Sequence, residues 1–256
     1  MHRHRQTFPH TPLAHPTSII GGSPHPYRLT VLTPGLIRYE YSPDSVFEDR
    51  ASVLAVNRCF LPTPDFRIKE SDNKLEIITE RIHVTYGKKE FHASGFSILV
   101  KGRHREHASV WHFGEDTPNL GGTARTLDEA DGRIALGPGV CSKNGFSNID
   151  DSGSMVFDED GYANVRKEGE GRVDGYFFGF GHDYREAVKA LYGLSGMQPL
   201  LPRWALGNWW SRYYAYTAKE YLELMDKFKD EGMSMTLLFT LLGCSQGNLE
   251  QAVLTA

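Results

Sequence analysis

Short runs in which apolar and polar side chains alternate are the feature that most limits how this chain can fold. Residues 37–41, 75–79 and 82–86 show this alternation, and turn-forming residues such as Gly87 bound each run. Successive side chains of a strand point to opposite sides, so a period of two predicts strands with one buried face. We therefore expect an antiparallel sheet over the first part of the chain.

Further runs extend this pattern without an intervening helix before about residue 180. We predict strands at residues 96–100, 109–113, 133–136, 155–158 and, as an apolar run covered on both faces, 176–180. So many strands in succession predict a mainly β fold, a β-sandwich over residues 27–198. Residues 1–26 contain five prolines and are predicted to be a flexible leader.

The period changes after the sandwich. Asp183 followed by Glu186 predicts the start of a connecting helix that ends at Gly193. After the prolines near residue 200, we predict a strand over 204–210, a helix beginning at the capping box Thr217-x-x-Glu220, and a strand over 233–239. Strand, helix and strand in this order form a βα unit of a parallel sheet or barrel.

Composition narrows the classes of function. The hydrophobic content of 40% is enough for a packed core, and the net charge of −4 argues against a dedicated nucleic-acid binder. The three cysteines lie far apart with no CxxC spacing, so neither a metal site nor a disulfide framework is indicated. No apolar stretch is long enough to span a membrane, and no secretory signal is seen, so we expect a cytoplasmic protein without a membrane partner.

Four stretches resemble glycoside hydrolase family 31. They are residues 119–128 (NLGGTARTLD), 145–152 (GFSNIDDS), 176–184 (YFFGFGHDY) and 202–216 (PRWALGNWWSRYYAY). The resemblance runs from about residue 28 to about residue 238, with the four motifs in the family's order. Any one of these motifs alone is a weak signal.

The resemblance implies a galactose-mutarotase-like β-sandwich followed by a (β/α)₈ barrel. On this basis residues 199–256 are the first βα unit of a truncated barrel. Family members are retaining enzymes that act on α-glycosidic bonds, commonly of α-glucosides or α-xylosides, and they need no metal or other cofactor. The implied partner is an α-linked oligosaccharide or glycoside; the sugar and the oligomeric state stay open.

The catalytic residues of the family are expected to be absent from these residues. Retaining hydrolysis uses two carboxyl groups about 5 Å apart, and in the family both are aspartates on later barrel strands. Residues 202–256 are far too few for a barrel of about 250 residues. Between Met233 and Ala256 the only charged residue is Glu250, so we predict an aberrant tail from about residue 239, produced by a frameshift, a misread intron or an early stop.

Three residues are candidates for binding sugar. The resemblance places Asp150 and Asp151 in a loop over the barrel mouth, where carboxylates accept hydrogen bonds from hydroxyls. The alternative is a local Asx-turn. Tyr213 corresponds to an aromatic residue that lines the sugar subsites, and the alternative is core packing.

Three interpretations of the whole chain follow. The first is a catalytically inactive N-terminal fragment of a retaining α-glycosidase, which leaves open whether the chain counts as an enzyme. The second is a stand-alone carbohydrate-binding β-sandwich, and the third is a product without function. The apolar residues 237–242 argue against a specialised binding module, because they form an unpartnered apolar edge.

Overall fold

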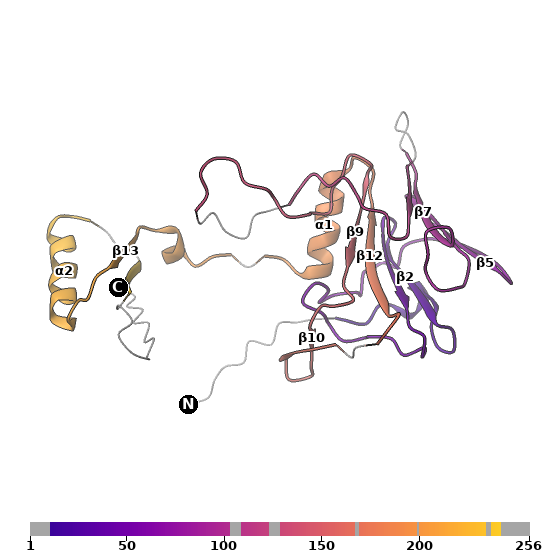
Figure 1. Cartoon of the computed structure of the whole chain (residues 1–256), viewed down its shortest axis with the longest axis horizontal. Coiled ribbons are helices and arrows are strands. Elements are labelled where there is room, and N and C mark those ends of the chain that lie inside the picture. The colour runs from indigo at the N-terminus through magenta and orange to yellow at the C-terminus, as the bar shows by residue number, and fades with distance from the viewer. Residues whose placement is uncertain are drawn as a thin grey trace. The chain divides into compact units, whose positions relative to one another are not determined.

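The computed structural model describes residues 11–102, 109–122, 129–166, 169–198, 200–233 and 237–241. The chain divides into two compact units, Met1–Met197 (the first unit) and Gln198–Ala256 (the second unit). Their elements are labelled in Figure 1, and each unit is described by itself. The predicted aberrant tail beyond Leu241, including Cys244, lies outside the described residues.

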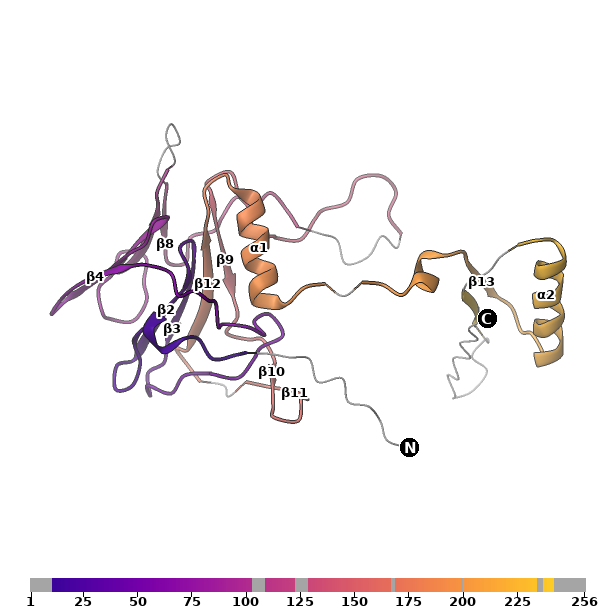
Figure 2. The same ribbon diagram turned by 180° about the vertical axis from the view of Figure 1, so that it is seen from behind.

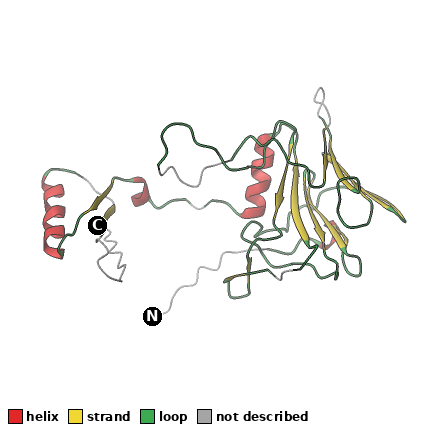
Figure 3. Ribbon diagram, viewed as in Figure 1, coloured by secondary structure: helices red, strands yellow, loops and turns green. Residues whose placement is uncertain are grey.

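The first unit contains two five-stranded antiparallel sheets (Figures 2 and 3). The first sheet has the strand order β1-β2-β3-β12-β9, with β1 Ile19–Gly21, β2 Tyr27–Thr33, β3 Leu36–Tyr41, β12 Val173–Gly179 and β9 Phe146–Asp150. The second sheet runs in sequence order, with β4 Arg67–Ser71, β5 Lys74–Ile78, β6 Ile82–Tyr86, β7 Phe96–Val100 and β8 Ser109–His112. The predicted mainly β fold is confirmed, and the two sheets form a β-sandwich.

One hydrophobic core lies between the two sheets. Alternate residues of the first sheet, such as Leu29, Tyr39 and Phe177, face alternate residues of the second sheet, such as Phe96 and Trp111. Many of its members are aromatic, and Trp111 packs against Phe177 with ring centroids 5.3 Å apart. The period-two pattern therefore arises because one side of each strand enters this core.

The other side of the first sheet is covered as well. Helix α1 (Tyr184–Ser195) contributes Ala187, Ala190 and Leu194 to a second core, against Tyr176 and Phe178 of β12. Figure 1 shows α1 beside β9 and β12. Because β12 is covered on both faces, nearly all of its residues are buried, as the continuous apolar run predicts.

The connecting helix differs from the prediction at both ends. Asp183 occupies the N-cap position, but its side chain makes no capping hydrogen bond and instead accepts one from Arg81 Nη2 at 2.9 Å. The helix continues past Gly193 and ends before Gly196, whose φ of 83° suits glycine. Gly193 packs against the Phe60 ring instead of ending the helix.

Other strand predictions are partly wrong. Residues 133–136 form no strand, because they lie in an exposed excursion without a buried face. Of residues 155–158, only Val156–Phe157 form a strand, β10, which pairs with β11 (Ala163–Asn164). The prolines of residues 1–26 do not prevent regular structure, since a 3₁₀ helix (Pro16–Ser18) and edge strand β1 lie there.

The second unit is a strand–helix–strand unit. Strand β13 (Trp209–Tyr213) pairs in parallel with β14 (Leu237–Leu241), and α2 (Ala218–Asp230) lies between them in the sequence. The single strand predicted over 204–210 is wrong, because a 3₁₀ helix (Arg203–Leu206) takes its first part. No helix in the described part of the chain is long and apolar enough to cross a membrane.

The predicted capping box at the start of α2 is confirmed and gives a testable expectation. Thr217 Oγ1 accepts a hydrogen bond from the Glu220 backbone N–H, and Glu220 Oε2 accepts one from the Thr217 backbone N–H. We expect Thr217→Ala to destabilise the helix by about 1 kcal/mol. Hydrogen exchange of the first-turn amides then becomes roughly fivefold faster. The exposed Lys219→Ala variant serves as the control, and equal exchange in both variants contradicts the capping role.

Candidate ligand-binding site

Three of the four sequence motifs meet at β9. Gly145 approaches Gly181 so closely that a side chain on it would lie 2.6 Å from the Gly181 Cα, and its carbonyl accepts the Gly181 N–H at 2.9 Å. Asn119 Oδ1 accepts the N–H groups of Gly121 and Gly139, both at 2.8 Å. Asn119 Nδ2 also donates to Ser147 Oγ of β9 at 3.4 Å. These contacts fix the strand that ends at the predicted binding residues.

Asp150 is the last residue of β9 and is exposed, so it lies in a strand and not in the predicted loop. Its Oδ1 accepts hydrogen bonds from the Ser152 N–H at 2.9 Å and from Ser152 Oγ at 2.5 Å. The Asx-turn considered as the alternative role of this aspartate is therefore present. Ser152 Oγ in turn accepts the Asp174 N–H at 2.9 Å, which ties the turn to β12.

Asp151 points to the interior. It is completely buried, and its Oδ2 accepts hydrogen bonds from Ser52 Oγ at 2.7 Å and from Arg166 Nη2 at 2.8 Å. Burial raises the pKa of this carboxyl above its ordinary value. The two adjacent aspartates therefore differ in surroundings: Asp150 faces solvent, and Asp151 anchors the turn.

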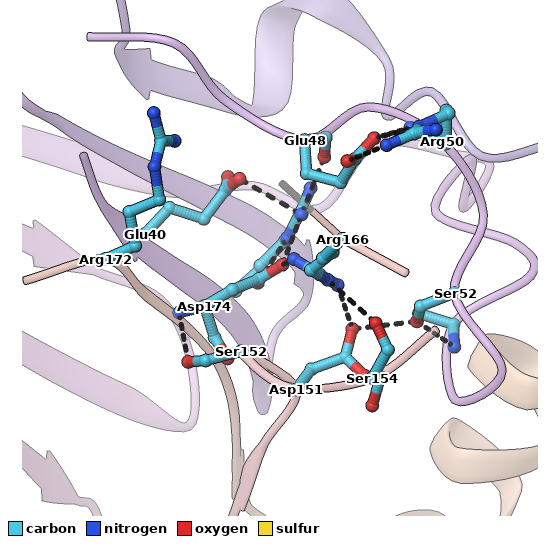
Figure 4. Close-up of polar contacts among 12 residues, drawn as sticks. Glu40, Glu48, Arg50, Ser52, Asp151, Ser152, Ser154, Arg166, Arg172 and Asp174 are labelled. Atoms are coloured by element: carbon cyan, nitrogen blue, oxygen red, sulfur yellow. Dashed lines mark hydrogen bonds and ion pairs between the residues drawn. The ribbon is translucent and has the colours of Figure 1, made fainter. Parts of the chain in front are cut away.

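Asp151 is one end of a largely buried cluster of six charged residues on the outer side of the first sheet, of which Figure 4 labels Glu40, Asp151, Arg166 and Asp174. We call it the charged cluster; its members are Arg28, Arg38, Glu40, Asp151, Arg166 and Asp174. The strand register makes it possible, because Arg28 of β2, Glu40 of β3 and Asp174 of β12 are direct neighbours across three strands.

Arginine–carboxylate pairs satisfy most of the polar atoms of the cluster. Arg28 binds Glu40 through two hydrogen bonds, of 2.7 and 2.8 Å, and Arg38 binds Asp174 in the same way, at 2.8 and 2.7 Å. Arg38 also reaches Glu40 at 3.0 Å. Arg166 forms an ion pair with Asp174 at 2.6 Å and a second one with Asp151. It therefore links the two ends of the segment between β9 and β12. Such two-bond arginine–carboxylate pairs are the strong, geometrically specific kind.

The surroundings shift the pKa values of the acids in opposite directions. Burial works to raise the pKa of Asp174, but the charges of Arg38 and Arg166 hold it well below its ordinary value. For Glu40, burial outweighs its arginines and raises the pKa. Burial also raises the pKa of Tyr176, whose hydroxyl accepts a bond from Arg58 Nε, to about 12.

The lowered pKa of Asp174 predicts a pH dependence of stability. A carboxyl with a depressed pKa in the folded state stabilises the fold above its unfolded pKa of about 4, and this contribution is lost as the pH falls further. We expect Asp174→Asn to be less stable than the wild type at pH 7, with a difference that shrinks below about pH 4. Urea unfolding at pH 7, 5 and 3.5 measures it, and a difference that stays constant with pH contradicts it.

A cleft of about 660 Å³ opens over the charged cluster. Its lining includes Glu40, Asp174 and Arg166 together with Ser152 and Gly153, which directly follow the two predicted aspartates. The volume lies in the range of small-molecule sites. Among the described residues, no group of three or more His, Cys, Asp or Glu side chains could hold a metal ion.

Most residues of this site were not predicted. The sequence pattern places Arg38 and Glu40 at the polar positions of an alternating strand, where exposure is the usual expectation, yet both are almost fully buried. No sequence motif near Arg166 predicts that its side chain forms an ion pair with a residue earlier in the chain. Tyr213, the third predicted residue, is the last residue of β13 in the second unit, and its side chain is 74% exposed.

The first unit thus belongs to the antiparallel two-sheet sandwiches, with a helix and a charged cluster on the outer side of one sheet. No family model and no curated protein matches the sequence. Among solved structures, a glycoside hydrolase family 31 dextranase of Flavobacterium johnsoniae complexed with isomaltotriose is similar, with a TM-score of 0.53 and 16% identity. The match covers 86% of this chain and 32% of the dextranase.

The same dextranase complexed with glucose gives a TM-score of 0.52 at 14% identity over the same shares. A family 31 α-xylosidase from a soil metagenome, complexed with xylose, gives 0.48 at 12% identity, covering 84% of this chain and 38% of the xylosidase; it adds nothing to the fold comparison. This chain spans about a third of the dextranase. The dextranase structures agree with the resemblance that the four motifs indicate, and at this identity the likeness shows the fold alone.

Proposed function

We propose that this chain forms the N-terminal portion of a retaining α-glycosidase of glycoside hydrolase family 31. The observation that carries the proposal is the fold likeness to the dextranase over 86% of the chain. The four motifs, found in the family's order, support it independently. In this proposal the sandwich is of the galactose-mutarotase type, and residues 199–256 begin the catalytic (β/α)₈ barrel.

The second unit has the features of a barrel start. Its strands are parallel and joined through a helix, as in the repeating unit of such a barrel. Large apolar side chains are exposed on it, including Trp209 at 51% and Leu222 at 60%. In a closed barrel, strand side chains face either the barrel interior or the surrounding helices. These exposed residues are therefore suited to contacts with further barrel elements.

The sugar-contacting role proposed for this chain falls on Asp150 and Tyr213. The Asp150 carboxylate is exposed and oriented by Ser152, which leaves its Oδ2 for a sugar hydroxyl. Tyr213 presents an exposed ring with a hydroxyl, which suits a pyranose. For Asp151 we propose an indirect role, because its buried carboxylate holds the turn through Arg166.

Hydrolysis of nitrophenyl α-glucoside and α-xyloside tests the proposal. Two proteins are compared: these 256 residues, and a version in which a complete barrel reading frame follows residue 238. We expect turnover only by the longer protein, because the resemblance implies that the two catalytic aspartates lie on later barrel strands. Turnover by the 256 residues themselves contradicts that assignment and directs the search to acids of the first unit, beginning with Asp150.

A second candidate function is a carbohydrate-binding module. The first unit favours it, because the described members of its two cores all lie within residues 11–197. Affinity electrophoresis in gels containing dextran separates the two candidates. Retardation of the 256 residues, together with no hydrolysis by the longer protein, supports the binding module. Hydrolysis by the longer protein supports the glycosidase.

A further inference from the structure

We infer that the cleft above the charged cluster is a binding site for a neutral oligosaccharide. The inference rests on the proposed function for the choice of saccharides as the ligand class. Its location and character come from the cleft itself, which lies wholly within the first unit.

The charges of the cleft favour a neutral polar ligand. Four carboxylates line it, from Glu40, Glu48, Glu170 and Asp174, against three guanidinium groups, from Arg50, Arg166 and Arg172. The lining therefore has only one more negative group than positive groups. A phosphate site needs an excess of positive groups, and a site for a polycation needs an excess of negative ones. A ligand rich in hydroxyl groups, which both donate and accept, fits the balanced lining.

The floor of the cleft keeps acceptor capacity for such hydroxyls. An ionised carboxylate offers about four lone-pair positions. Glu40 uses three of them, for two bonds from Arg28 and one from Arg38. Asp174 also uses three, for two bonds from Arg38 and one from Arg166. By this count each carboxylate has about one lone-pair position left, and both carboxylates line the cleft.

Part of the lining of the cleft is apolar. Val46, Phe47 and Val165 line it, and Val165 is 72% exposed. The Arg28 guanidinium lies 4.7 Å from the centre of the Phe47 ring, which holds that ring in place. Figure 4 shows Glu40, Asp174 and Arg166 close together, with Arg50 and Arg172 to either side. Small-molecule sites combine apolar and polar lining residues, and pyranose rings carry both kinds of surface.

Gly153 provides a way to fill the cleft without touching the charged cluster. It lines the cleft and is exposed, and a Cβ added to it meets no atom within 4 Å. We therefore expect Gly153→Trp to fold normally and to place the indole in the ligand's space. The matched control is Lys69→Trp on β4, whose residues are all exposed and which belongs to the second sheet.

The experiment is an NMR titration of the isotopically labelled 256-residue chain with isomaltotriose. In the wild type we expect shifts at the amides of Ser152, Gly153, Val165 and Gly169. The dissociation constant rises at least tenfold in Gly153→Trp and changes less than twofold in Lys69→Trp. Inorganic phosphate at equal concentration gives no shifts at these amides. If Gly153→Trp does not fold, the map of shifts on the wild-type chain decides by itself.

Three results overturn the inference. They are the absence of shifts with isomaltotriose in up to 20-fold excess over millimolar protein, shifts confined to residues outside the cleft, and an unchanged affinity for isomaltotriose in Gly153→Trp. Shifts at the cleft produced by phosphate and not by isomaltotriose overturn the ligand class. The titration measures binding without turnover. A failed hydrolysis assay with the longer protein therefore counts against the proposed function, and a failed titration counts against the cleft.

Discussion

Replacing Arg38 by methionine is expected to lower the free energy of unfolding by about 3–5 kcal/mol. Arg38 is 3% exposed and is the cation shared by Glu40 and Asp174. Without it, two adjacent buried carboxylates compete for the remaining arginines, and removing one partner of a buried ion pair leaves an uncompensated charge. Urea denaturation at pH 7, followed by tryptophan fluorescence, measures the loss.

The control for this change is Arg50→Met. Arg50 forms the same kind of two-bond pair with Glu48, at 2.8 and 2.7 Å, but its side chain is 44% exposed. A solvent-exposed pair contributes about 0–1 kcal/mol. Equal losses of unfolding free energy in the two variants contradict the view that burial makes the charged cluster sensitive. If Arg38→Met leaves the free energy of unfolding unchanged, the carboxylates become protonated at low cost.

Trp111→Ala is expected to lower the free energy of unfolding by about 3–5 kcal/mol. The indole is 1% exposed and extends from β8 of the second sheet to Phe177 of the first. It also contacts the rings of Tyr39 and Phe96, at 5.8 and 5.9 Å between centroids. Its removal leaves a cavity where the two sheets meet, and rigid neighbouring rings relax little into such a space.

Val110→Ala is the matched control for Trp111→Ala. Val110 is the preceding residue on the same strand, but its side chain points away from the core and is 43% exposed. A change within about 0.5 kcal/mol is expected there. Thermal unfolding followed by near-ultraviolet circular dichroism compares the two, and a Trp111→Ala loss as small as that of the control contradicts the central position of the indole.

Strands with one buried and one partly exposed face could be predicted from the sequence. β6 and β7 have regularly alternating burial, and their alternating residues match it. β4 escaped prediction because all its residues are exposed, so no core selects apolar residues at every second position. For residues 133–136 the error is the opposite one. Their side chains alternate in polarity, but they belong to no sheet.

The site could be predicted only in part. The GFSNIDDS motif lies beside the cleft, because Asp150 and Asp151 directly precede the cleft residues Ser152 and Gly153. The sequence could not separate the exposed aspartate from the buried one, since the difference depends on Ser52 and Arg166, which lie 99 and 15 residues from Asp151. The sequence pattern with a polar residue at every second position is the same whether that residue faces water or a buried arginine.

The two sheets differ in the sequence separation of their paired strands, and this difference predicts an order of assembly. The second sheet uses consecutive hairpins within residues 67–112, so each strand pairs with the one before it. The first sheet stays incomplete until β12 pairs with β3 and with β9, more than a hundred residues later. Local pairings form faster than distant ones, and the N-terminal part leaves the ribosome first. In the nascent chain Arg38 therefore lacks its partner Asp174 until β12 has been synthesised, and β12 then links β3 to β9.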